Sequence, residues 1–118
     1  MPISKYDLIE RTGKIGQDVI LVCKKIKLSP INTPLVNQIV KSATSIGANY
    51  CEATEANSKK DFCSKLFIAK KEAKETLHWI KMIAIAEPDV CSELDKIADE
   101  AHQIILIFSA SIKSCSEK

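Results

Sequence analysis

Two pairs of acidic and histidine residues in this chain have the spacing of metal ligands on a helix. Glu75 and His78 form one pair, and Asp99 and His102 form the other, each with its members three residues apart. Di-iron four-helix bundles use pairs of this kind on two helices, with one further glutamate from each of the other two. The spacing therefore raises the hypothesis of a di-metal enzyme.

The helical phase of these residues argues against a metal site. The four side chains lie roughly 80° to 140° or more from the centre of the apolar stripe on their helix, whereas ligands must point inward. The two further glutamates would have to be Glu10 and either Glu52 or Glu55. We therefore expect no metal, no cofactor and no catalytic residue, and the di-metal enzyme is the least favoured of three hypotheses.

Other enzyme motifs are absent from the sequence. The only glycines are Gly13, Gly16 and Gly47, and they form no phosphate-binding loop. No Gly-x-Ser-x-Gly nucleophile turn occurs either. The chain has five cysteines, an odd number, and no two have C-x-x-C spacing. We expect reduced, mostly buried thiols at all five positions, which are Cys23, Cys51, Cys63, Cys91 and Cys115.

A basic surface on one helix is the strongest candidate for binding. At about 100° per residue, six basic side chains share one sector of the segment 59–86. We call this set the lysine face; its members are Lys60, Lys70, Lys71, Lys74, His78 and Lys81. Phe67 lies among them, and Asp61, Glu72 and Glu75 lie on the other flank.

The lysine face has two interpretations. Lysines with an aromatic ring between them can lie along a phosphate backbone, as in proteins that bind nucleic acid without reading its sequence. Alternatively, the lysines are simply solvated and Phe67 lies in a contact between subunits. Only one of the 17 Lys and Arg residues is arginine. Because lysine lacks the planar fork that reads guanine, any nucleic acid should be recognised by its backbone or shape, as RNA or as DNA.

Four helical segments account for nearly the whole chain and predict one all-α domain over residues 1–118. The periodicity predicts helices at about 5–27, 34–55, 59–86 and 88–113. Thr33 with Pro34 is expected to start the second helix, and Ser58 with Asp61 the third. Long helices with short connections pack antiparallel. The sequence therefore predicts an antiparallel up-down-up-down four-helix bundle.

The net charge of +2 conceals an uneven distribution. The predicted third helix carries seven basic and three acidic residues, whereas the fourth, counted from Glu87, carries two basic and six acidic residues. Helices of opposite charge attract within a bundle or across a subunit boundary. The start of the chain lacks the apolar core of a signal peptide, and no apolar run approaches the length of a membrane span. We therefore expect a cytoplasmic protein with no membrane contact.

Two short motifs carry a resemblance to a known family. The first is the stretch 42–53, SATSIGANYCEA, and the second is SKKDF at 58–62. Further matching positions follow within the third helix, at Lys65, Ile68, Ala69, Lys71, Glu72, Ala73, Glu75, Thr76 and Trp79. Over about residues 32–84 the chain resembles the 23S rRNA intervening-sequence protein family, also called the four-helix bundle protein family. The first and fourth helices match only in pattern.

The resemblance implies a small bacterial four-helix bundle that assembles as a homopentameric ring. Some members are encoded within insertions in rRNA genes, and no enzymatic activity is established for the family. A related protein is an accessory subunit of diversity-generating retroelement reverse transcriptases and has a basic surface that binds nucleic acid and the polymerase. The favoured hypothesis is therefore a non-enzymatic, oligomeric protein that associates with nucleic acid. The alternative is a scaffold or accessory subunit for a polymerase-like partner protein.

Structural roles are the favoured explanation of these motif residues. Gly47 would permit close helix packing, and Asn49 would bond to a neighbouring helix. Glu52 would pair with Lys59 or Lys60, and Trp79, off the apolar stripe, would be an exposed subunit contact. We assign such roles to Ser45, Gly47, Asn49, Glu52, Ser58, Asp61 and Trp79.

Overall fold

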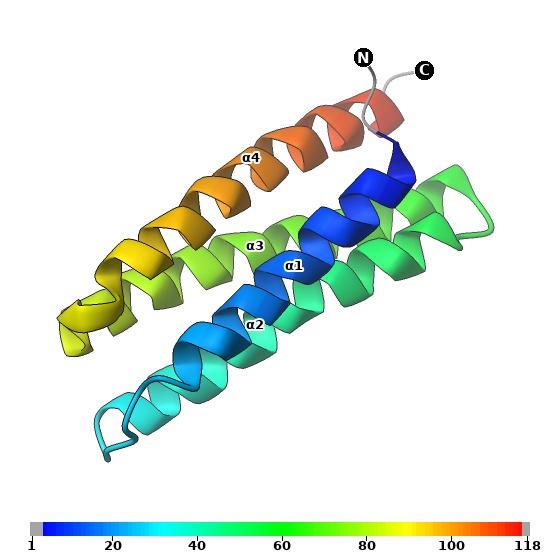
Figure 1. Ribbon diagram of the computed structural model, residues 1–118. Coiled ribbons are helices and arrows are strands. Elements are labelled where there is room, and N and C mark those ends of the chain that lie inside the picture. The colour runs from blue at the N-terminus through cyan, green and yellow to red at the C-terminus, as the bar shows by residue number, and fades with distance from the viewer. Residues whose placement is uncertain (1–3, 117–118) are drawn as a thin grey trace.

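The chain folds into four long antiparallel helices that run up, down, up and down (Figure 1). The computed structural model describes residues 4–116. The long helices are α1 (Lys5–Cys23), α2 (Asn32–Thr54), α3 (Lys59–Ala86) and α4 (Cys91–Ser116). A single 3-10 turn, η1 (Pro88–Val90), leads into α4, and no strand occurs within the described part of the chain. The predicted all-α four-helix bundle is confirmed.

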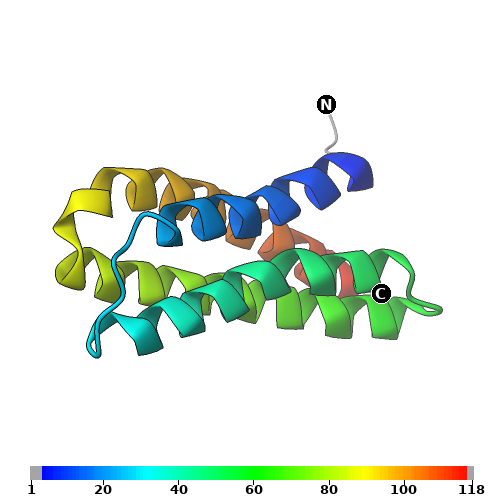
Figure 2. The same ribbon diagram turned by 60° about the horizontal axis from the view of Figure 1, so that its bottom comes forward.

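The helices form two layers, with α2 and α3 below and α1 and α4 above (Figure 2). The bundle measures 49 × 27 × 20 Å, so it is an elongated rod. The start of α1 and the end of α4 lie at the same end of this rod, as the chain direction requires (Figure 1). Among the described residues, none of the helices combines the length and the hydrophobicity needed to cross a membrane.

The helix α1 ends at Cys23, four residues before its expected end at Lys27. The amide groups of Lys25 and Ile26 bond to carbonyl groups three residues earlier, so the chain tightens there and leaves the helix. At its other end, the hydroxyl of Ser4 caps α1 by accepting from the amide of Asp7 at 3.1 Å.

The start of α2 differs from the expected Thr33 cap. The helix begins at Asn32, two residues before its expected start at Pro34, and the amides of Ser29 and Asn32 donate to each other's side chains. The Nδ2 of Asn32 also donates to the Lys27 carbonyl and to Glu87 Oε2, both at 3.0 Å. Asn32 is only 1% exposed. One buried amide thus joins the α1–α2 loop to the end of α3, which sequence periodicity did not indicate.

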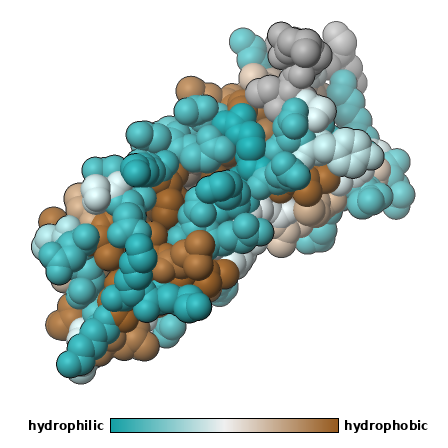
Figure 3. All heavy atoms as spheres, in the orientation of Figure 1, coloured by the Kyte–Doolittle hydropathy of each residue, from teal (hydrophilic) through white to brown (hydrophobic). Residues whose placement is uncertain are grey.

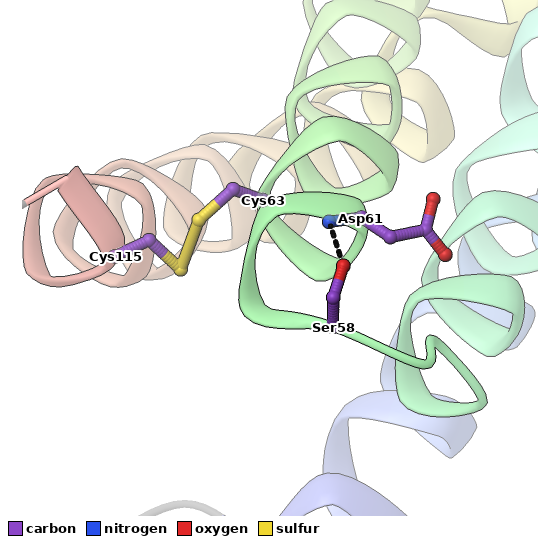
Figure 4. Close-up of a disulfide and its surroundings, with 4 residues drawn as sticks. All are labelled: Ser58, Asp61, Cys63 and Cys115. Atoms are coloured by element: carbon purple, nitrogen blue, oxygen red, sulfur yellow. Dashed lines mark hydrogen bonds between the residues drawn. A yellow bond between two sulfur atoms is a disulfide. The ribbon is translucent and has the colours of Figure 1, made fainter.

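The start of α3 is at its predicted place. Ser58 Oγ accepts from the amide of Asp61 at 3.0 Å, which satisfies one of the free amides in the first turn (Figure 4). The Pro88 turn then begins the last helical segment, and α4 extends to Ser116, three residues beyond the expected end.

The core contains polar side chains that the apolar pattern did not predict. Thr12, Ser42 and Thr76 are all buried in the bundle. Thr76 Oγ1 lies 3.0 Å from Ser42 Oγ and 2.9 Å from the Glu72 carbonyl, so these hydroxyls link α2 to α3. Since a hydroxyl can bond to the carbonyl one turn before it, threonine and serine enter the core without an unsatisfied group.

Two glycines let α1 and α2 approach closely. A Cβ added at Gly47 would lie 3.2 Å from the Cα of Gly13, and one added at Gly16 would lie 3.2 Å from the Cα of Thr44. Backbone atoms cannot yield as side chains do, so both positions require glycine for this separation. Gly47 therefore lies where α1 and α2 approach closely, as expected for a packing role.

Candidate nucleic-acid interface

The lysine face lies along the outer side of α3. Leu66, Ala69, Ala73, Thr76, Ile80 and Ile83 are the buried residues of this helix, and they line its opposite side. Five of the six basic side chains are exposed, and Lys70 is half-exposed at the edge next to α4. The apolar stripe of α3 therefore faces inward, and its basic side chains lie on the surface together.

The ammonium groups of the lysine face form no direct bonds within the part of the chain that the structure describes. None of the five lysines forms an ion pair or hydrogen bond among residues 4–116. Four other ion pairs occur in that part of the chain, and they involve Arg11, Lys14, Lys25 and Lys65. The lysine face thus combines high charge density with ammonium groups that form no ion pair or hydrogen bond among the described residues, which suits contact with an external polyanion.

Two carboxylates flank the lysine face on the side next to α2. Burial raises the pKa of Glu72, and a hydrogen bond and the negative charge of Glu75 raise it further. The charges of Lys71 and Lys41 act in the opposite direction, so Lys71 already interacts with a neighbouring carboxylate. The carboxylates of Glu72 and Glu75 therefore offset part of the positive charge on this flank of the lysine face.

Aromatic and apolar side chains interrupt the lysine face. Phe67 is 57% exposed and Ile85 is 81% exposed, both on the same side of α3 as the lysines. The His78 ring meets the Trp79 ring edge-on, with 4.8 Å between the ring centres. An exposed ring between ammonium groups offers a stacking surface for a base as well as charge for a phosphate.

Trp79 differs from the expected exposed position. It is half-buried and packs against the core, so only part of the ring is left for any other contact. At 100° per residue it lies on the α2 side of α3, where the groove between the two helices covers part of a large ring. The angular position of Trp79 around α3 therefore predicted more exposure of its side chain than the structure shows.

The motif residues Asn49 and Glu52 bond to partners other than those expected from the sequence. Asn49 Nδ2 donates to the Ser45 carbonyl at 2.9 Å, so it bonds within its own helix and not to a neighbour. Glu52 pairs with Lys65 at 3.3 Å and not with Lys59 or Lys60. Lys65 lies one to two turns further along α3, where the antiparallel helices run side by side again after the loop. The hydroxyl of Ser45 donates to the Lys41 carbonyl, a local bond without reach to another helix.

The acidic and histidine pairs do not converge. Glu75, His78, Asp99 and His102 are all exposed on the surfaces of their helices. Within the part of the chain that the structure describes, no group of three or more His, Cys, Asp or Glu residues is arranged to hold a metal ion.

The expectation for the cysteines is wrong in two respects. Cys63 on α3 and Cys115 on α4 form a disulfide. The three free cysteines are not buried: Cys51 is exposed, and Cys23 and Cys91 are half-buried. Burial raises the pKa of the Cys23 thiol, which favours its neutral form. The disulfide joins residues 52 positions apart, a pairing that no local spacing rule reveals.

A cleft between α1 and α4 was also not foreseen. Ile15, Val22 and Ile97 contribute its apolar side chains, and its volume is about 490 Å³. Ion pairs join the helices towards its two ends, from Arg11 to Glu100 and from Lys25 to Glu93. The cleft lies on a different side of the bundle from the lysine face, so it does not extend the basic surface.

Comparisons with known proteins agree with this architecture. The sequence model of the family described as 23S rRNA-intervening sequence protein matches residues 4–110. The crystal structure of a protein of unknown function from the S23 ribosomal protein family of Bacteroides thetaiotaomicron is similar, with 29% sequence identity and a TM-score of 0.75. The match covers 89% of this chain and 97% of that one. No curated protein matches the sequence significantly.

Proposed function

This chain belongs to the 23S rRNA-intervening sequence protein family, and we propose that it is a non-enzymatic, oligomeric protein that binds the backbone of RNA or DNA through the lysine face of α3. The observation that carries this proposal is the set of five lysines on one helix side, none of which forms an ion pair or hydrogen bond among residues 4–116. The family's name, which refers to a segment of rRNA, supports the choice of nucleic acid.

The proposed contact is electrostatic and tolerant of sequence. Lysine ammonium groups neutralise phosphates and release counterions, so affinity should fall steeply with salt. On duplex nucleic acid the slope of log K against log salt is about 0.9 per phosphate contacted. Phe67 adds a surface on which an unpaired base can stack.

Charge reversal within the lysine face tests the proposal. The double variant Lys71→Glu/Lys74→Glu should abolish most binding of a fluorescent RNA, measured by anisotropy over a salt series. The control is Lys24→Glu/Lys27→Glu, which changes the net charge equally at exposed positions near the end of α1. Equal losses in both variants would show that overall charge governs binding, and unchanged binding in the first would remove the lysine face from the function.

A partner protein is the second candidate, and the exposed apolar side chains favour it. Phe67 and Ile85 lie on the lysine face at 57% and 81% exposure, which exceeds the needs of a purely electrostatic contact. A polymerase-like protein that docks on this face would remain bound to the tagged bundle after nuclease treatment. Loss of all bound protein upon nuclease treatment would favour the nucleic acid.

Self-assembly is part of the proposal, with five copies as the number that the family resemblance implies. Further large apolar side chains support an extensive contact surface, since Leu21, Leu28, Ile31 and Leu106 are all more than half exposed. Brown apolar patches are visible among the hydrophilic side chains in Figure 3, over the half of the rod where α1 ends. Light scattering with and without nuclease would report the subunit number and any bound nucleic acid together.

A further inference from the structure

The disulfide between Cys63 and Cys115 joins the first turns of α3 to the last turn of α4. The two side chains point towards each other across the gap between the helices (Figure 4). Their Cα atoms are 6.2 Å apart, within the usual range for a disulfide. Because the residues are 52 positions apart, the bond closes a loop that includes most of both helices.

The end of α4 has little other packing to hold it. Phe108 is the last fully buried residue of this helix among those whose burial the structure describes. Beyond it, Ile112 is only half-buried against the core, and Ala110, Lys113 and Ser114 are exposed. The stability of a terminal segment follows from the apolar surface that it buries, so these last turns depend strongly on the disulfide.

Both sulfur atoms belong to half-exposed residues near the surface. Thiol–disulfide exchange requires that an attacking thiolate reach one sulfur in line with the bond, and a buried disulfide prevents this. The location therefore permits exchange without unfolding of the bundle.

We propose that Cys63 and Cys115 form a reversible redox staple, which holds the last two turns of α4 on α3 when oxidised and releases them when reduced. This inference does not depend on the proposed function. Formation of the bond consumes a small disulfide such as glutathione disulfide. One cysteine thiolate attacks it and expels a glutathione thiolate, and the second cysteine thiolate then attacks the mixed disulfide and expels the other. The protein loses two protons and two electrons, and the two glutathione molecules receive the electrons. A dithiol reductant reverses the reaction.

Hydrogen exchange measured by mass spectrometry on the full chain tests the staple. The protein is first equilibrated with glutathione disulfide or with dithiothreitol, and the disulfide is identified by peptide mass. We expect amides in residues 109–116 to exchange about tenfold faster after reduction, because local opening then no longer requires the bond to break. Amides in the centre of α3, around Ala73, should be unchanged.

Three cysteine variants test whether the faster hydrogen exchange depends on this disulfide. Cys63→Ser and Cys115→Ser should each show the fast exchange of the reduced protein in either solution. Cys91→Ser, which removes a half-buried free cysteine at the other end of α4, should keep the redox response. The proposal is overturned if peptide mapping finds no bond between Cys63 and Cys115 after oxidation, or if exchange at 109–116 is equal in both states.

Discussion

Arg11 and Glu100 form a two-pronged ion pair between α1 and α4. Arg11 Nε donates to Glu100 Oε2 at 2.8 Å, and Nη2 donates to Oε1 at 2.7 Å. The cleft beside this pair separates the same two helices. A bidentate contact is the strongest geometry for such a pair, so it has a larger role here than a single surface bridge.

Removal of this ion pair should destabilise the bundle modestly. Both side chains are about one-third exposed, and water screens their attraction. Glu100→Gln should lower the free energy of unfolding by about 1 kcal/mol, measured by urea denaturation. The control is Asp18→Asn, which breaks the more exposed pair with Lys14 within α1 and should cost less than about 0.5 kcal/mol. An equal or greater loss from Asp18→Asn would contradict the special role of Arg11 and Glu100.

The same pair predicts a pH dependence of stability. The hydrogen bond from Arg11 lowers the pKa of Glu100 below its ordinary value, although burial acts in the opposite direction. The carboxyl group of Glu100 therefore binds a proton less tightly in the folded protein than in the unfolded chain. The stabilisation from its ion pair with Arg11 is present at neutral pH and is lost as the pH falls through the lowered pKa of Glu100. The difference in unfolding free energy between the native protein and Glu100→Gln should therefore shrink from about pH 7 to about pH 3. A constant difference would contradict the prediction.

Gly47 on α2 and Gly13 on α1, which approach each other closely, should respond differently to alanine. Gly47→Ala places a methyl group 3.2 Å from the Cα and N of Gly13, so the helices must separate. We expect a loss of about 1–3 kcal/mol, as for other overpacked sites, and a lower melting temperature. A Cβ at Gly13 meets no atom within 4 Å. Gly13→Ala should therefore be neutral or stabilising by up to about 1 kcal/mol, because alanine favours the helix. Similar effects at both positions would refute the close approach.

The buried hydroxyl pair between α2 and α3 should contribute to stability jointly. Thr76→Val removes the bond to Ser42 and to the Glu72 carbonyl but preserves the shape of the side chain. We expect a loss of about 1 kcal/mol in thermal or chemical unfolding. Ser42→Ala should cost a similar amount, and the double variant should lose less than the sum because the two share one bond. Strict additivity would show that the hydroxyls act independently.

Phe67 allows a test of how the lysine face would bind nucleic acid. If a base stacks on this exposed ring, Phe67→Ala should weaken binding of a single-stranded RNA by about 1 kcal/mol or more and leave duplex binding nearly unchanged. Tyr6→Ala is the control, because Tyr6 is an exposed aromatic side chain on α1, away from the lysine face. Equal weakening of single-stranded and duplex RNA, measured by anisotropy, would exclude stacking.

The sequence alone determined the helical architecture. Apolar residues recur with the helical period, and Ser58 and Asp61 have the spacing of a helix start, so local rules suffice for α3. They also place the lysine face on one side of α3, since phase within a helix depends only on residue number. The family assignment likewise follows from sequence, because it rests on residues 4–110 matched directly.

Only the tertiary structure decided which residues meet across helices. The disulfide between Cys63 and Cys115, the bond between Thr76 and Ser42, and the Arg11–Glu100 pair each join residues 34 or more positions apart. Such contacts depend on the separation and rotation of whole helices, and hydrophobic periodicity fixes neither. Asn32 shows the same limit within a loop, where the tertiary position of Glu87 decides the bonds of a buried amide.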